Sequence, residues 1–108
     1  MIRRRPRAIH AIIDLAAYIG ERSPASAERF MDATEATFQK LERTPGLGHL
    51  HQSDDPRLAN IRVYAVKGFP NHLIFYQVID NGIAILHVLH GARDIDAALE
   101  EELNKGPL

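Results

Sequence analysis

The hydrophobic pattern of this chain changes its period near residue 60, and that change constrains the fold more than any other feature of the sequence. Before this point, apolar residues recur every three or four positions, as they do along one side of a helix. Beyond it, apolar and polar residues alternate or form short β-branched and aromatic runs, as they do in strands. The order predicts helices packed on one face of a small antiparallel β-sheet, which is an α+β fold.

Two helices are expected in the first half of the chain. The first begins at Pro6, because a proline in the first turn loses no hydrogen bond, and it runs to about Arg22. Ser23 and Pro24 then provide an N-cap and a first helical position for a second helix, which ends in a turn at 44–46. Because only a few residues join them, the two helices should pack antiparallel as a helical hairpin.

The second half is expected to form an antiparallel meander. Its three strands are predicted at 61–66, 73–79 and 83–90, with a short amphipathic helix at 95–103 after them, and a short first strand at 2–4 is left open. The helical hairpin should cover one face of this sheet. The other face would then be free for a ligand or a partner.

The turn between the last two strands decides which side chains share a face. If residues 80–82 form a three-residue loop, His72 lies opposite His90. A two-residue loop would change the pairing partners. With the longer loop, the face of His72 also carries Ile74, Tyr76, Leu86 and Val88, whereas Leu73, Phe75, Gln77, Ile85, His87 and Leu89 point the other way.

The bulk composition narrows the class of protein. A length of 108 residues fits one domain spanning 1–108. With 45% hydrophobic and 25% charged residues the chain is typical of a globular domain, and no apolar run approaches the roughly 20 residues of a membrane-spanning helix. The arginine-rich start does not resemble a signal peptide, so a cytoplasmic protein is expected. The absence of cysteine excludes disulfides and thiolate chemistry.

The charge is small in sum but uneven along the chain. A net charge of -1 argues against a dedicated nucleic-acid binder, so no sequence-specific DNA binding is expected. Residues 1–7 carry four arginines, while residues 94–102 are rich in Asp and Glu. Such runs are usually solvated chain ends. The alternative is a basic patch that receives a polyanion or an acidic partner.

Candidate chemistry rests on cations and imidazoles, because the usual catalytic and phosphate-binding motifs are absent from the sequence. The best metal cluster is His49-x-His51 near residues 54–55, but surface loops gather such residues by chance, and no metal or cofactor is expected. A strand histidine such as His90 is more often structural than catalytic. Arg62 lies within a predicted strand. It is equally consistent with a functional cation and with a charge that protects a sheet edge from aggregation.

Two strand segments carry a resemblance to a known family. Residues 72–78 read HLIFYQV, and residues 88–94 read VLHGARD. Together they look like the signature of ParE-type toxins of the ParE/RelE superfamily. Other pieces follow in the family's order, among them Pro24 with Ala27 and Phe30 at the start of the second helix. The resemblance spans nearly the whole chain.

This resemblance implies the toxin of a type II toxin–antitoxin system, of the kind known for plasmid stabilisation. Such a toxin would poison DNA gyrase without being an enzyme, and a ParD-like antitoxin would hold it inactive. On this reading, the residues expected to contact the target are Arg62, Tyr76, His90 and Arg93, and those expected to contact the antitoxin are Ile74, Leu86 and Val88.

Two other readings stay open. The branch of the superfamily similar to RelE and YoeB cleaves mRNA on the ribosome, and its chemistry would fall here on Arg62, His90 and Arg93. Gly91, however, stands where that branch has a tyrosine, and Leu73 stands where it has an arginine, which favours the gyrase reading. The third reading is an inactive toxin or a plain interaction module, because a fold does not fix a function.

Overall fold

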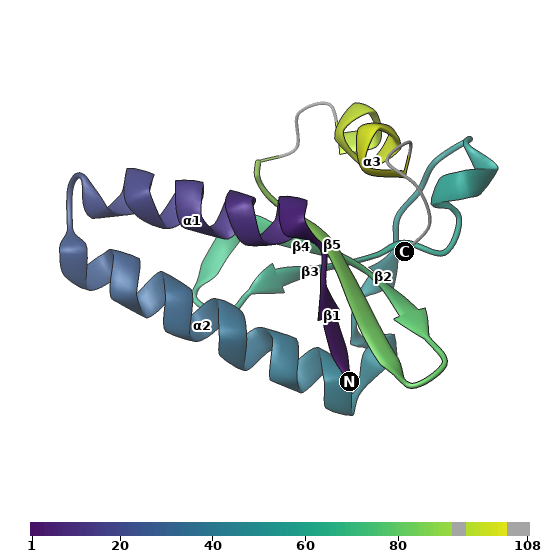
Figure 1. Cartoon of the computed structure of the whole chain (residues 1–108), viewed down its shortest axis with the longest axis horizontal. Helices are drawn as coiled ribbons and strands as arrows, with labels where there is room; N and C mark the ends of the chain where they lie inside the picture. The colour runs from purple at the N-terminus through teal and green to yellow at the C-terminus, as the bar shows by residue number, and fades with distance from the viewer. Residues whose placement is uncertain (92–94, 104–108) are drawn as a thin grey trace.

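A five-stranded sheet forms the middle layer of the molecule (Figure 1). The computed structural model describes residues 1–91 and 95–103. Across the sheet the strands are ordered β1-β5-β4-β3-β2. Along the chain the elements are β1 (Ile2–Arg4), α1 (Pro6–Gly20), α2 (Pro24–Arg43), the short 3-10 helix η1 (Pro45–Leu47), β2 (His49–Leu50), a second 3-10 helix η2 (Pro56–Leu58), β3 (Arg62–Val66), β4 (Phe69–Ile79), β5 (Gly82–His90) and α3 (Ile95–Leu103).

The helical hairpin expected from the sequence is confirmed by α1 and α2, which run side by side along the sheet (Figure 1). The Ser23 side chain caps α2 by accepting a hydrogen bond from the backbone N–H of Ser26 over 3.1 Å. α1 ends at Gly20, two residues before the expected end at Arg22. A Cβ on Gly20 would lie 3.4 Å from that of Ala27, which is ordinary van der Waals contact between the two helices.

The main core fills the space between the hairpin and the sheet. Phe30, Phe38 and Leu41 of α2 are fully buried there, and Ile74 and Tyr76 meet them from β4. Burying one side chain of this size stabilises the fold by roughly 1.5–3 kcal/mol relative to leaving it in water. The apolar stripe of α2 therefore holds the hairpin against the sheet.

The sheet is mixed rather than purely antiparallel, which corrects the sequence expectation in one respect. The short strand at Ile2–Arg4 is present, and it pairs in parallel with β5. The other neighbouring strands pair antiparallel, as expected. A parallel neighbour needs a long connection, and here the hairpin and three strands lie between β1 and β5 in the chain.

The register of β4 against β5 places His72 opposite His90, as predicted, but by a different route. Ile79 pairs with Gly82, so the loop is shorter than the three residues assumed. A register shift between Phe75 and Tyr76 then restores the pairing of the two histidines. At the shift, Phe75 pairs with His87 and Tyr76 with Ile85, which leaves Leu86 without a partner in the ladder, as in a β-bulge.

The face of the sheet that was expected to be open is covered. Leu99 of α3 and Leu58 of η2 are fully buried against it, beside Phe75 and Leu86. α3 lies next to η2 at this end of the molecule (Figure 1). The expectation was wrong because the apolar residues of 95–103 need a surface to cover, and this face provides it. In residues 1–91 and 95–103 no helix is long and apolar enough to cross a membrane.

Candidate functional site

Arg62 and Tyr76, two of the predicted target contacts, lie opposite each other on β3 and β4 and hold the segment that follows α2. The Tyr76 hydroxyl donates to the Pro45 carbonyl at 2.7 Å and accepts from the Gly48 N–H at 2.8 Å. Arg62 Nη1 donates to the Gly48 carbonyl at 2.6 Å. Burial raises the pKa of Tyr76, so this phenol stays a hydrogen-bond donor.

His90, the third predicted target contact, is exposed at the end of β5. Its ring lies 4.6 Å from that of His72 between centroids, and His72 also packs against the rings of Phe30 and Phe69. Burial, and then the nearby His90, lower the pKa of His72. The fourth predicted contact, Arg93, lies outside the described residues.

Arg62 and His90 are not brought together. Arg62 pairs with Tyr76 of β4, and His90 pairs with His72 of the same strand. The positions of Arg62 and His90 therefore differ by four residues along β4. At about 3.3 Å per residue this separates them by roughly 13 Å along the strand direction alone. An acid–base pair must reach the same reacting group within hydrogen-bond distance. These two residues therefore do not form one catalytic site.

The two positions that separate the nuclease branch from this chain have structural roles of their own. Leu73 packs against the second core cluster beneath α3. Gly91 has a φ of 79°, in the left-handed region that disfavours any residue with a side chain. The backbone of Gly91 disfavours a tyrosine, and an arginine in place of Leu73 would remove an apolar contact with the second core.

The three predicted antitoxin contacts are buried within the chain. Ile74 and Val88 face the helical hairpin in the main core, and Leu86 faces α3 in the second core. Their assignment to one open face was therefore wrong. The bulge in β5 is the reason, because one extra residue moves Leu86 to the side opposite Ile74 and Val88.

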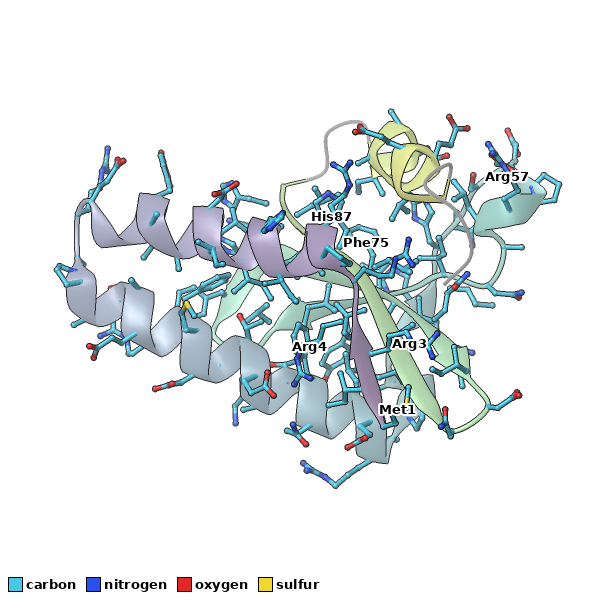
Figure 2. The ribbon with its side chains drawn as sticks, in the orientation of Figure 1. Met1, Arg3, Arg4, Arg57, Phe75 and His87 are labelled. Atoms are coloured by element: carbon cyan, nitrogen blue, oxygen red, sulfur yellow. The ribbon has the colours of Figure 1, made fainter. Side chains whose placement is uncertain are left out.

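α3 is fixed over the sheet by polar contacts. Asp96 lies 2.5 Å from His51 Nε2 and accepts from Ser53 Oγ at 2.8 Å, and these two contacts, that with His51 first, lower the pKa of Asp96. Arg7 binds Glu101 at 2.8 Å. Arg57, labelled in Figure 2, forms ion pairs with Asp55 and with Glu100 of α3. His51 thus joins α3 to the sheet, and the described residues contain no cluster of three or more side chains that would hold a metal ion.

A groove that the sequence reasoning missed lies between α2 and the β3–β4 hairpin, with a volume of about 1080 Å³. Its α2 side is made by Arg29, Ala33, Ala36, Lys40 and Arg43. These residues follow one another at spacings of four and three, which places them on one stripe of the helix beside the core stripe. This second stripe, small in the middle and basic at both ends, is the signal by which the groove was visible in the sequence.

The opposite wall of the groove belongs to the sheet. Tyr64 and Phe69 supply aromatic surface, and Lys67 adds a fourth cation near the turn. The Lys40 ammonium lies 5.6 Å from the centre of the Tyr64 ring, a cation–π contact. Asp32 is the single carboxylate of the lining, so four cations less one anion leave a net charge of +3.

Two arginines near the start of the chain form ion pairs, unlike the groove cations. Arg4 pairs with Glu35, and Arg7 with Glu101, so the basic start of the chain is partly neutralised inside the molecule. In residues 1–91 and 95–103, by contrast, no carboxylate forms an ion pair with Arg29, Lys40, Arg43 or Lys67. The groove thus combines an apolar surface with a rim of net positive charge.

Comparison with known proteins identifies the class of molecule to which this fold belongs. Residues 2–95 match the family model described as the ParE toxin of the type II toxin–antitoxin system parDE. The chain is therefore the toxin of a type II toxin–antitoxin system. It belongs to the ParE toxin family, whose members act together with an antitoxin partner. No curated protein matched the chain significantly.

Proposed function

We propose that this ParE-family toxin inhibits DNA gyrase in the cytoplasm, and that a ParD-like antitoxin neutralises it. The choice of gyrase over the ribosome rests on the distance between Arg62 and His90, which is roughly 13 Å along the strands. Because these two described residues do not share a site, binding to the target is the mode of action that we propose.

The nuclease alternative is disfavoured at the two positions where that branch has an arginine and a tyrosine. Each positioned proton-transfer group contributes about 10²–10⁴ in rate, so a site that lacks two of them is a poor catalyst. Leu73 is part of a core cluster, and Gly91 adopts a left-handed backbone, so neither supplies such a group. Arg62 Nη1 is also hydrogen-bonded to the Gly48 carbonyl.

His90 and Arg93 are the target contacts that we retain, with His90 exposed at the strand end just before Arg93 in the chain. Arg93→Ala should reduce growth arrest, since an arginine is suited to planar, bidentate contacts. Antitoxin affinity should stay near that of the wild type. If the variant is folded and fully toxic, Arg93 is not a target contact.

The proposed function is tested by expressing the chain alone and together with a ParD-like antitoxin. Expression alone should arrest growth and leave ribosome-bound messages uncut, and co-expression should restore growth. Codon-specific cuts in those messages would replace the gyrase assignment with the nuclease one. Normal growth, with the folded protein present, would identify an inactive toxin or an interaction module.

A further inference from the structure

Two histidines, His72 and His90, lie side by side where the β4–β5 ladder ends. We infer that they form a binding site for a divalent transition-metal ion of the type of Zn²⁺ or Ni²⁺, with water at the remaining coordination positions. Binding of such an ion is independent of the proposed function, and its test contains neither gyrase nor antitoxin.

The position of the pair in the ladder brings the two side chains close together. The Gly91 N–H donates to the Asn71 carbonyl at 2.8 Å, so these two residues face each other as a hydrogen-bonded pair. Hydrogen-bonded and non-hydrogen-bonded pairs alternate along an antiparallel ladder. The neighbouring pair, His72 and His90, is therefore of the second kind, in which facing side chains lie closest.

The distance between the two rings fits two ligands of one ion. Their centroids are 4.6 Å apart, and their planes are inclined at 41°. The nitrogen of a zinc-bound imidazole lies roughly 2.0–2.1 Å from the metal, so the centroids of two imidazoles on one ion are roughly 4.5–5 Å apart. The two rings are thus placed to share an ion without movement of either strand.

The surroundings of His72 order its ring and leave it available. The ring packs against those of Phe30 and Phe69, with centroids 4.9 and 5.9 Å away. Its Nδ1 is buried without a hydrogen-bond partner in the described structure, so Nε2 is the nitrogen that can face an ion. Burial, and then His90, lower the pKa of His72, which keeps the ring in the neutral form that binds metals. An ordered ligand loses little entropy on binding.

The ligand type decides the kind of ion. Imidazole nitrogen suits zinc, copper and nickel, whereas Mg²⁺ and Ca²⁺ take oxygen ligands. Within residues 1–91 and 95–103, no third histidine or carboxylate joins the pair to make a larger cluster. His90 is exposed, so solvent reaches the ion and completes its coordination. The site is therefore open, unlike the four-ligand sites of structural zinc.

The test is a calorimetric titration of zinc chloride into the purified chain at neutral pH, with magnesium chloride as the second titrant. His72→Gln and His90→Gln each remove one ligand. The matched control, His10→Gln/His49→Gln, removes two exposed imidazoles elsewhere. Circular dichroism verifies that the variants are folded. Because His90 is exposed, its variant tests the site even if His72→Gln does not fold.

We expect one zinc ion per chain and no binding of magnesium. Each single variant should bind zinc at least about tenfold more weakly, because loss of an outer-shell partner alone costs roughly 10–100-fold in metal affinity. The control should stay within about three-fold of the wild type. Zinc should also raise the melting temperature of the wild type more than that of His90→Gln, since an ion that binds only the folded chain stabilises it.

Three results would overturn the inference. Equal zinc affinity of the wild type and His90→Gln, or no zinc binding at all, would leave the two rings as an aromatic pair only. Weaker binding by the control, with the single variants unchanged, would move the ion to His10 or His49. Half an ion per chain would replace the single-chain site with one shared between two copies.

Discussion

Tyr76 donates its phenolic hydrogen to the carbonyl of Pro45 over 2.7 Å and so ties the middle of β4 to the turn that follows α2. The same hydroxyl accepts from the buried Gly48 N–H. One fully buried side chain thus positions the short segment between the helical hairpin and the sheet.

Replacing Tyr76 by phenylalanine should lower the free energy of unfolding by about 1–3 kcal/mol, because it leaves the Gly48 N–H without its acceptor. Urea unfolding measures the change. Tyr64→Phe is the control, since the Tyr64 hydroxyl makes no hydrogen bond to a described residue, and its effect should be smaller. An unchanged unfolding midpoint for the Tyr76 variant would contradict the prediction.

Gly82→Ala should destabilise the junction of β1 and β5 by at least about 2 kcal/mol. Gly82 has a φ of 154°, and a Cβ there would lie 1.8 Å from the Met1 carbonyl oxygen. Gly46→Ala is the matched control, because its Cβ meets no atom within 4 Å. The two melting temperatures decide the prediction, which fails if both alanine variants melt together.

Leu99→Ala should loosen α3 before it unfolds the rest of the chain. Leu99 is fully buried in the cluster with Phe75 and Leu86, and truncating a buried leucine costs about 2–5 kcal/mol. Faster hydrogen exchange confined to 95–103 and its contacts is the expected result. Ala97→Ser, at an exposed position on the same helix, should leave the exchange unchanged. Uniform acceleration across the sheet would show that α3 is not a separate unit.

The stability of the chain should fall on the acidic side because of His72. Its folded pKa lies below the ordinary value of 6.5, through burial and the neighbouring His90. Between these two values the unfolded chain binds more protons, so the free energy of unfolding decreases as the pH drops below about 6.5. Urea unfolding at several pH values should reveal this dependence. His72→Gln should flatten it, and His10→Gln, at an exposed position of α1, should not.

The period of the hydrophobic pattern was enough to predict the helices, the three long strands and the hairpin layer. It was not enough to predict which residues of β5 face the helices. Leu86 was placed with Ile74 and Val88, but the bulge beside it adds one residue and reverses its face. The cross-strand pair His72–His90 was predicted correctly because the short loop and the bulge offset each other.

The candidate site was harder to predict than the fold. Arg62 and Tyr76 looked available on a strand, but their hydrogen-bond partners are backbone groups of Pro45 and Gly48, far away in the sequence. Contacts of this kind depend on tertiary structure and leave no periodic signal. The groove, in contrast, has a signal in α2, where Arg29, Ala33, Ala36, Lys40 and Arg43 form a second stripe.

We propose that this toxin stops DNA gyrase by binding it. The most direct measurement is ATP-dependent supercoiling of a relaxed plasmid by purified gyrase, titrated with the purified chain alone and with an equimolar amount of its antitoxin. We predict that the chain alone inhibits supercoiling and that the antitoxin restores it. Full supercoiling in the presence of excess folded toxin would contradict the claim.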